Sequence, residues 1–184
     1  IPQDAMVFSS IARLEPIKAP DIIIDAFQQS FNIEKNCFLL MVGSSNSKKY
    51  LESLKQLVEP KYRERIKFLG HRGDISNILS STNVFVHAIR IKEGFGISLA
   101  EALASGVPCI AADRGAPGEY IKTGYNGWLV KEMNTNSYIK TYQRAYKDFC
   151  TNRQHFITNS LNSAEELGAE TQLEKLLVLI NGLN

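Results

Sequence analysis

The sequence predicts an α/β fold in which a parallel sheet of about six strands is covered by helices on both faces. Short apolar segments alternate with segments whose apolar residues recur at helical spacing, which is the pattern of successive strand–helix units. The segment 37–42 is apolar throughout, as expected for a strand buried on both faces. With 184 residues, the chain is long enough for one domain with a sizeable core.

Each predicted strand is a short apolar run. The strands lie at residues 5–8, extending as far as 10, and at 37–42, 66–69, 84–88, 107–111 and 127–130. Helices are expected between them at 20–27, where Pro20 occupies the first turn, and at 50–58, 74–79 and 97–105. Asp74 is expected to cap the third of these helices, and Gly106 to end the fourth.

The pattern changes after residue 130 and becomes helical. Asn134 or Asn136 is expected to cap a helix, and a further helical region begins near Asn152 and is broken or kinked at Gly168. We expect a single domain over 1–184, with a core at about 5–131 and C-terminal helices at about 134–181. Two apolar stripes support these helices: Tyr138, Ile139, Tyr142, Ala145, Tyr146 and Phe149, and then Leu173, Leu176, Leu177 and Ile180.

Composition excludes several classes of protein. Lys and Arg number 21 against 19 Asp and Glu, and a net charge of +2 does not indicate a nucleic-acid binder. The longest apolar run, 37–42, is far too short to span a bilayer, and no segment resembles a signal peptide. Three cysteines with no close pair predict free thiols in a reducing compartment, with Cys37 and Cys109 inert in core strands, so a cytoplasmic location is expected.

Ligands of an open parallel sheet bind beyond the carboxyl ends of its strands, so the residues that follow each strand are candidates for a site. If the sheet is parallel, these loops meet at one edge, where they would form a local basic pocket for an anionic ligand. The residues after the first three strands are mostly basic or small: Arg13 and Lys18, then Gly43, then Gly70, His71 and Arg72.

The most informative segment follows the fourth strand and reads Glu93-Gly-Phe-Gly-Ile-Ser-Leu-Ala-Glu101. Its two glycines allow a sharp turn and a close approach of a ligand, and a helix that begins near Ile97 offers unpaired amides to a phosphate. Glu93 before the helix and Glu101 within it would place a carboxylate on either side of that anion site. A Gly-x-Gly or a Glu pair alone would more often be a turn and a solvated helix residue; the combination with Arg13 and Lys18 favours a ligand site.

These segments resemble the nucleotide-sugar-binding, C-terminal half of retaining GT-B glycosyltransferases, the family-four type known as glycosyl transferases group 1. Residues 11–27 resemble the family's Arg-Leu-x-x-x-Lys-Gly-x-Asp segment, 93–101 match its Glu-x7-Glu motif, and 115–130 resemble its Gly-rich turn followed by Asn-Gly-x-Leu-Val. The resemblance implies a Rossmann-like domain that forms half of a GT-B fold. In this sequence Ala19 replaces the usual Gly, Ser44-Ser45 replace an acidic-Gly pair, and His87-Ala88 stand where Pro-Ser is frequent.

The resemblance implies a role for each matched residue. Arg13 and Lys18 would neutralise the diphosphate of the donor, Glu93 would bind hydroxyls of the transferred sugar, and Glu101 would hold the ribose. Gly43 would also contact the donor, and His71 and Arg72 would lie near the base of its nucleotide. The segment that would cradle sugar and phosphate through its backbone is Gly94, Phe95, Gly96, Ile97 and Ser98.

The family transfers a hexosyl or related sugar from a UDP-, GDP- or similar nucleotide sugar to a glycan, a lipid carrier or a small acceptor, with retention. No Asp-x-Asp motif and no His/Cys cluster with ligand spacing occurs here, so neither a metal nor another cofactor is expected. The family's N-terminal acceptor domain is missing from this sequence. We therefore expect an excised domain that is inactive alone and that has this acceptor domain as its partner.

Other functions stay open at this stage. A non-catalytic nucleotide-binding or regulatory module on the same fold is the alternative, because fold does not fix function. A dinucleotide-binding Gly-x-Gly-x-x-Gly is missing after the first strand, and no P-loop motif occurs. The basic run 61–65 is either a solvated turn or a contact with anionic lipids, which would place the protein at the cytoplasmic face of a membrane.

Overall fold

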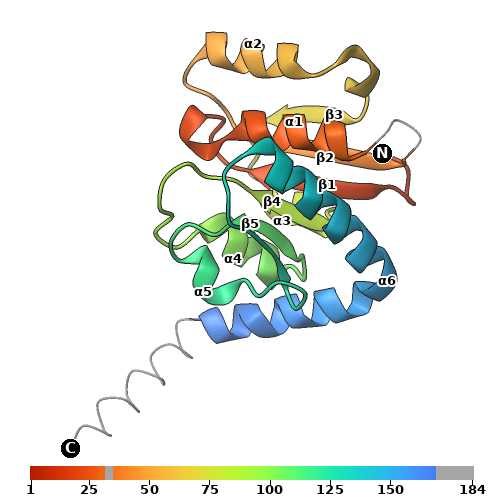
Figure 1. The fold of residues 1–184 in the computed structure, drawn as a ribbon, viewed down its shortest axis with the longest axis vertical. Coiled ribbons are helices and arrows are strands. Elements are labelled where there is room, and N and C mark those ends of the chain that lie inside the picture. Colours follow the sequence, from red (N-terminus) through yellow and green to blue (C-terminus); the bar gives the residue numbers. More distant parts are fainter. Residues whose placement is uncertain (32–34, 169–184) are drawn as a thin grey trace, which may run out of the picture.

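In the computed structural model, which describes residues 1–31 and 35–168, six strands form one parallel sheet in the order β3-β2-β1-β4-β5-β6 (Figure 1). This confirms the predicted fold class and every predicted strand. The strands are β1 (Met6–Ile11), β2 (Cys37–Val42), β3 (Ile66–Gly70), β4 (Val84–His87), β5 (Cys109–Ala112) and β6 (Gly127–Val130). The prediction placed the start of β5 too early, because Pro108 has no N–H group to donate to a neighbouring strand.

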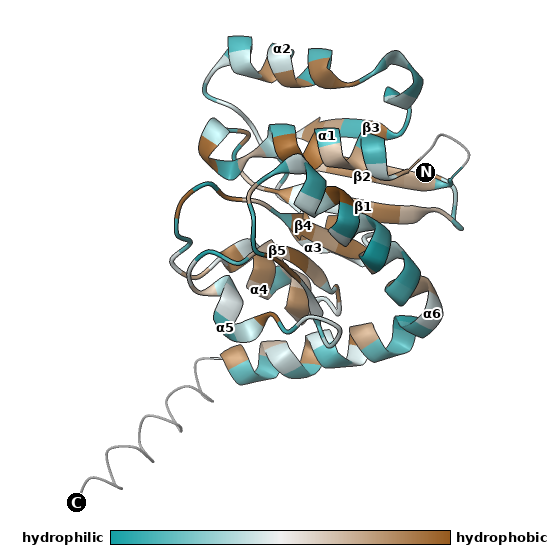
Figure 2. Ribbon diagram, in the orientation of Figure 1, coloured by the Kyte–Doolittle hydropathy of each residue, from teal (hydrophilic) through white to brown (hydrophobic). Residues whose placement is uncertain are grey.

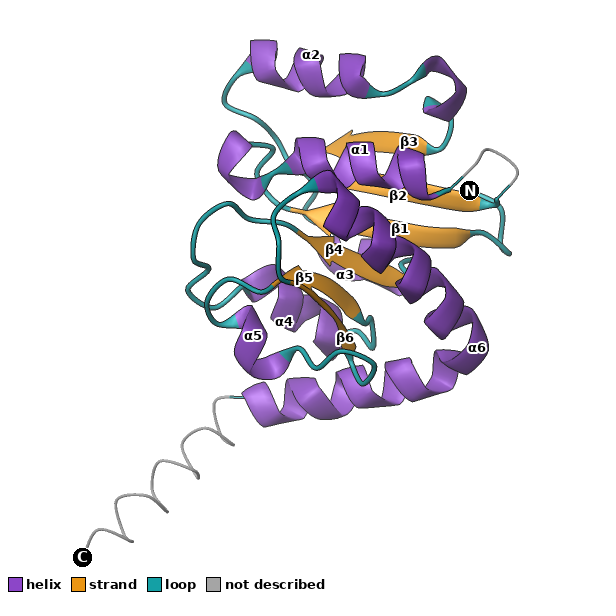
Figure 3. Ribbon diagram, in the orientation of Figure 1, coloured by secondary structure: helices purple, strands orange, loops and turns teal. Residues whose placement is uncertain are grey.

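The helices connect successive strands, as expected for parallel strand–helix units. Three short helices were not predicted: η1 before α1, η2 after α2 and α5 after β5 (Figure 3). The helices are η1 (Pro16–Lys18), α1 (Pro20–Ser30), α2 (Lys48–Leu57), η2 (Pro60–Tyr62), α3 (Ile75–Ser80), α4 (Ile97–Ala104), α5 (Pro117–Tyr120) and α6 (Thr135–Leu167).

Of the two residues Asn134 and Asp74, both predicted to cap a helix, only the first does so. Asn134 caps α6, since its side-chain oxygen accepts a hydrogen bond from the Ser137 amide at 2.9 Å. Asp74 precedes α3 but makes no capping bond, because Arg72 binds its carboxylate at 2.6 Å.

The predicted boundary at Asn152 is a kink within α6, where this residue has φ −135° and ψ 47°. The predicted stripe from Leu173 onward lies outside the described residues.

The sheet is covered on both faces, as the apolar strands predicted. On β1, Phe8 faces α1 and α6, and its ring centroid lies 5.1 Å from that of Tyr142. Val7, the preceding residue, points to the opposite face, where it packs with Ile78 of α3. The strands are accordingly the most apolar part of the molecule, whereas α2 and α6 carry hydrophilic residues along their length (Figure 2).

The strand order places a switch point between β1 and β4. From β1 the chain builds the sheet outward through β2 and β3, then returns to β4 on the other side of β1. The loops that follow β1 and β4 therefore lie at the carboxyl ends of neighbouring strands, at the point where the direction of sheet growth reverses, which is the usual ligand position in this architecture. Within the described ranges, no helix combines the length and the apolar character that crossing a membrane requires.

Candidate functional site

The site predicted from the sequence centres on two loops that meet at the switch point. Residues 12–19 follow β1 and contain η1, and residues 88–96 follow β4 and lead into α4. All strands run parallel, so both loops lie at the carboxyl edge of the sheet. Lys18 comes from the first loop and Glu93 from the second. The topology thus brings together two residues that the sequence placed in one pocket.

Lys18, Glu93 and His87 form a hydrogen-bonded cluster at this edge, which we call the Glu93 cluster. The Nζ atom of Lys18 donates to Oε2 of Glu93 at 2.6 Å, and Nε2 of His87 lies 3.2 Å from the same oxygen. The other oxygen, Oε1, accepts a hydrogen bond from the Gly94 amide at 3.2 Å. His87 is only 4% exposed, whereas the side chains of Lys18 and Glu93 are 25% and 17% exposed. The carboxylate therefore sits at the boundary between the core and solvent.

The electrostatics of the Glu93 cluster follow from this position. Burial alone would raise the pKa of Glu93, but the hydrogen bonds from Lys18 and His87 outweigh it and bring the pKa below its usual value. Burial lowers the pKa of His87, and the hydrogen bond to Glu93 opposes this lowering only in part. At neutral pH the cluster consequently holds an ionised carboxylate and a neutral imidazole.

The backbone of Glu93 is fastened to the loop that follows β5. Its amide donates to the carbonyl of Arg114 at 2.9 Å, and its carbonyl accepts from the amide of Ala116 at 3.1 Å. Gly115, between these two residues, packs so closely that an added Cβ would lie 2.3 Å from the Glu93 carbonyl oxygen. Glu93 is thus held on its backbone by the β5–α5 loop and on its side chain by residues from the β1–α1 loop and β4.

Arg90 fastens the loop that carries Lys18, a role that the sequence did not indicate. The Arg90 amide donates to the carbonyl of Ile17 at 2.9 Å, and its guanidinium donates to the carbonyl of Pro16. The same guanidinium binds the carboxylate of Asp21 through two hydrogen bonds, at 2.6 and 3.1 Å. This bidentate arrangement fixes η1 and the start of α1 against the β4–α4 loop.

The start of α4 has the geometry predicted for an anion site. Gly96 precedes the helix in the left-handed region (φ 81°), and an added Cβ would lie 2.9 Å from the Tyr120 hydroxyl, which donates to the Phe95 carbonyl. The amides of Ile97 and Ser98 open the helix and have no partner inside it. Phe95 and Ile97 are exposed, at 46% and 70%. The helix therefore presents its amides beside an uncovered apolar surface.

The remaining predicted residues lie at the same edge of the sheet but outside the Glu93 cluster. Arg13 and Glu101 are exposed, and neither side chain has an ion pair or hydrogen bond with another described residue. His71 is exposed after β3. Arg72 is occupied by Asp74 through two hydrogen bonds, at 2.7 and 2.6 Å. The structure brings Lys18 and Glu93 into contact and leaves Arg13 and Glu101 unengaged.

Gly43 has a structural reason to be glycine. Its φ is 136°, and an added Cβ would lie 1.9 Å from the carbonyl oxygen of Ala12 in the β1–α1 loop. The Gly43 amide also donates to the carbonyl of Gly70 at 2.8 Å, so three strand-end loops meet here. At Gly43, which the resemblance placed among the donor-binding residues, it is the protein's own backbone that approaches closely.

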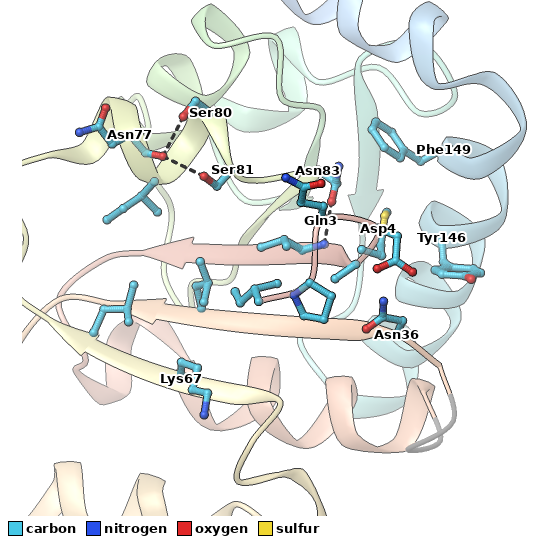
Figure 4. Close-up of a pocket in the computed structure, with 18 of the residues that line it drawn as sticks. Gln3, Asp4, Asn36, Lys67, Asn77, Ser80, Ser81, Asn83, Tyr146 and Phe149 are labelled. Atoms are coloured by element: carbon cyan, nitrogen blue, oxygen red, sulfur yellow. Dashed lines mark hydrogen bonds between the residues drawn. The ribbon is translucent and has the colours of Figure 1, made fainter.

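A large groove lies elsewhere on the described residues. It is a groove of about 980 Å³ along β1–β3 beside α3, and it extends to Tyr146 and Phe149 of α6 (Figure 4). Arg72 is the predicted donor-binding residue that lines it. The polar groups at its α3 end bond within their own helix, since the Asn77 carbonyl accepts from the hydroxyls of Ser80 and Ser81. Lys18, Glu93 and His87 do not line this groove.

His87 belongs to the Glu93 cluster, although the sequence marked it only as a departure from the family's Pro-Ser pair. It ends β4 in a buried position and also bonds to Glu93. The available signal was its place as the last residue of the strand at the switch point, where polar side chains meet ligands. The role of Arg90 could not be predicted from the sequence in this way, because it depends on Asp21, which lies 69 residues away.

The strand order and the switch point define a domain of the doubly wound α/β class. Comparison with protein families narrows this class. The model of the family described as glycosyl transferases group 1 matches residues 1–162. The chain therefore belongs to the glycosyl transferases group 1 family, and the resemblance to GT-B enzymes that the motifs predicted is confirmed.

Curated relatives include enzymes with different nucleotide donors in their names. UDP-Gal:alpha-D-GlcNAc-diphosphoundecaprenol alpha-1,3-galactosyltransferase from Escherichia coli is 27% identical over 148 residues, which cover 79% of this chain and 38% of that enzyme. The GDP-mannose-dependent monoacylated alpha-(1-6)-phosphatidylinositol monomannoside mannosyltransferase from Corynebacterium glutamicum is 32% identical over 123 residues, covering 62% of this chain and 31% of that enzyme. The chain thus spans well under half the length of these relatives.

Solved structures agree on the fold. HepE from Anabaena, solved in complex with UDP-glucose, superposes with a TM-score of 0.77 at 25% identity, covering 89% of this chain and 44% of that chain. WaaG, described as a glycosyltransferase involved in lipopolysaccharide biosynthesis, gives a TM-score of 0.76 at 19% identity, covering 90% of this chain and 44% of that one. The chain thus spans less than half the length of either solved protein.

Proposed function

We propose that this chain is the donor-binding half of a retaining glycosyltransferase and that it holds a nucleotide-diphosphate sugar between the β1–α1 and β4–α4 loops. The observation that carries the proposal is the Lys18–Glu93 pair, which spans the switch point at 2.6 Å. A cation suited to a diphosphate and a carboxylate suited to sugar hydroxyls lie side by side there. Membership of the family and the UDP-glucose complex of the Anabaena relative support it.

The diphosphate would be bound by positive charge from three sources. Lys18 reaches it from η1, Arg13 from the loop after β1, and the amides of Ile97 and Ser98 from the start of α4. Arg13 is free to do so because it has no partner among the described residues. As the bond to the sugar stretches, these groups stabilise the charge that grows on the leaving diphosphate.

The sugar and nucleoside would be bound by the flanking groups. Glu93 accepts hydrogen bonds from hydroxyls of the transferred sugar, and Glu101, exposed one turn into α4, accepts those of the ribose. Gly94 and Phe95 would contact the sugar beside Glu93. Gly43, His71 and Arg72 lie nearer the base, and Arg72 must leave Asp74 in part to contact it.

The transfer step follows from these positions. The bond between the anomeric carbon and the β-phosphate oxygen breaks, and its electron pair goes to that oxygen. The acceptor hydroxyl attacks the anomeric carbon on the same face, and its proton passes to the leaving phosphate, so the configuration is retained. No covalent enzyme intermediate is needed. The acceptor, a glycan, lipid carrier or small molecule, would be bound by a further domain of the kind that makes up the other half of the relatives.

We propose that this charge stabilisation needs neither a metal ion nor another cofactor. Lys18, Arg13 and the α4 amides supply the positive charge that a divalent cation provides in other enzymes. If so, EDTA leaves the affinity for a nucleotide sugar unchanged. A large loss of affinity in EDTA, restored by Mg²⁺ or Mn²⁺, would contradict this part of the proposal.

Isothermal titration calorimetry with a panel of UDP-, GDP- and ADP-sugars tests the proposed function. We expect one nucleotide series to bind, with an affinity that decreases as salt screens the charges. Lys18→Met should weaken binding by about tenfold to a hundredfold, the effect of losing a hydrogen bond to a charged group. Lys48→Met removes the same charge from an exposed position in α2 and serves as the control. Equal effects of the two variants would overturn the proposal.

A further inference from the structure

Lys18 and His87 hold the same oxygen of Glu93, but they are not equivalent. Lys18 carries its ammonium on a flexible four-carbon chain, extends from a three-residue helix and is partly exposed. His87 is 4% exposed, ends a central strand, and its carbonyl accepts a hydrogen bond from the buried Tyr138 hydroxyl at 2.9 Å. One donor is therefore accessible to solvent at the end of a flexible side chain, and the other is fixed in the core.

The unpartnered nitrogen of His87 indicates the direction of its hydrogen bond. In the described part of the chain, Nδ1 of His87 is one of three buried side-chain polar atoms without a hydrogen-bond partner. A buried acceptor without a partner is tolerated more often than a buried N–H group. The proton of the neutral ring is therefore on Nε2, which faces Glu93 Oε2, and Nδ1 carries the lone pair. In this tautomer His87 donates to the carboxylate.

We propose that His87 is a positioning residue that keeps Glu93 oriented toward the sugar when Lys18 turns to the donor diphosphate. This inference rests on the proposed function. Without a donor, Lys18 and His87 share Oε2. When a diphosphate arrives, the ammonium of Lys18 is drawn to it, and the carboxylate loses the shorter of its two side-chain hydrogen bonds. His87 retains the other one, so Oε1 stays available to a sugar hydroxyl.

The test compares the affinities for a nucleotide sugar and for its nucleoside diphosphate. Their ratio, the sugar increment, reports contacts to the sugar alone. The donor used is the member of the UDP-, GDP- and ADP-sugar panel with the largest increment on the unmodified chain. His87→Leu should reduce this increment by about tenfold, as expected for losing a hydrogen bond to a charged group, and should leave the affinity for the nucleoside diphosphate within about twofold.

Two further variants separate positioning from packing. His87→Gln retains an N–H donor and should preserve most of the increment, whereas a packing role would make it as harmful as His87→Leu. His155→Leu, at an exposed position of α6, is the control and should change neither affinity. If the increment is lost in Glu93→Gln but kept in His87→Leu, the role of His87 is overturned and the proposed function stands. If no donor binds more tightly than its nucleoside diphosphate, the proposed function itself fails.

A spectroscopic measurement on the unmodified chain does not depend on whether these variants fold. Nitrogen NMR of histidine-labelled protein at pH 7.5 should show His87 with a protonated Nε2 and a bare Nδ1, both before and after the donor is added. A ring protonated on Nδ1 alone, or doubly protonated, would contradict the inference because the hydrogen bond to Glu93 would then be absent or of another kind.

Discussion

The ammonium of Lys18 lies 2.6 Å from the carboxylate of Glu93, although 75 residues separate them in the sequence. The contact exists because β1 and β4 are neighbours in the sheet and their following loops face each other across the switch point. Arg90 of the β4–α4 loop adds hydrogen bonds to Pro16 and Ile17 of the β1–α1 loop and an ion pair with Asp21 at the start of α1. The fold therefore holds the paired charges together.

Gly94 and Gly96 should respond differently to alanine. An added Cβ at Gly94 meets no atom within 4 Å, and its φ is not left-handed, so Gly94→Ala should leave the free energy of unfolding within about 0.5 kcal/mol. If a donor approaches this backbone, the same change should weaken nucleotide-sugar binding by about tenfold. Urea unfolding and calorimetry measure the two effects. Unchanged affinity in Gly94→Ala would show that no ligand approaches here.

Gly96→Ala provides the comparison. Its left-handed φ and the Tyr120 hydroxyl 2.9 Å from an added Cβ predict a loss of about 1–2 kcal/mol in the free energy of unfolding. Gly96→Ala should therefore be impaired in stability as well as in binding, and Gly94→Ala in binding alone.

Ala19, which departs from the family's usual glycine, lies in the left-handed region with φ 44°. An alanine in this conformation is strained by about 1–2 kcal/mol, which offsets the benefit of its buried methyl group. The variant Ala19→Gly should accordingly lower the free energy of unfolding by no more than about 0.5 kcal/mol, and an increase is also consistent with the strain. Ala26→Gly, at an equally buried position inside α1, should lower it by about 1–2 kcal/mol. Similar losses in both variants would refute the strain at Ala19.

Acid should destabilise the folded chain through His87. Burial lowers the pKa of its imidazole below 6.5, so the unfolded chain binds a proton first as the pH falls through that value. Stability is then lost on acidification, by at most about 1.4 kcal/mol per pH unit from this group. His87→Gln should reduce the loss between pH 7.5 and 5.5 in urea unfolding, and exposed His71→Gln should not. A pH dependence unaltered by His87→Gln would disprove this origin.

The three cysteines should differ sharply in reactivity. Cys150 is exposed, whereas Cys37 and Cys109 are buried, and burial raises the pKa of Cys37 to about 12 and that of Cys109 still further. Since the thiolate is the reactive form, iodoacetamide at pH 8 should modify Cys150 alone in the folded chain and all three after unfolding. Peptide mass spectrometry identifies the modified residue. Rapid labelling of Cys109 in folded protein would contradict its placement in the core.

The sequence predicted the sheet well because each strand is a compact apolar run. The strand 37–42, apolar at every position, could only be covered on both faces, and the structure confirms this. Boundaries were harder to predict. The start of β5 depends on the missing N–H of Pro108, and the short helices η1, η2 and α5 are too brief to give a helical pattern of apolar residues. The spacing of apolar residues along the sequence does not predict such details. The kink of α6 at Asn152 agrees with the further helical region expected to begin there.

The site was predictable where strand-end position and residue type coincide, as for Lys18 and Glu93. His87 and Arg90 were harder to assign because their partners depend on tertiary structure. His87 contacts Glu93 only because the β5–α5 loop holds the Glu93 backbone, and Arg90 binds Asp21 across 69 residues. The membrane contact suggested for 61–65 stays a prediction. In that run Lys61 pairs with Glu59, and Glu64 with Lys67, at 3.0 and 2.7 Å.

The central claim, that a nucleotide sugar binds at the switch point, is tested most directly by mapping amide chemical shifts of the labelled chain during a titration with the best-binding donor. The account predicts that the largest changes fall in residues 13–18 and 93–101, at the ends of β1 and β4. Changes centred instead on the groove beside α3, at residues such as Ser81, Tyr146 and Phe149, would contradict it.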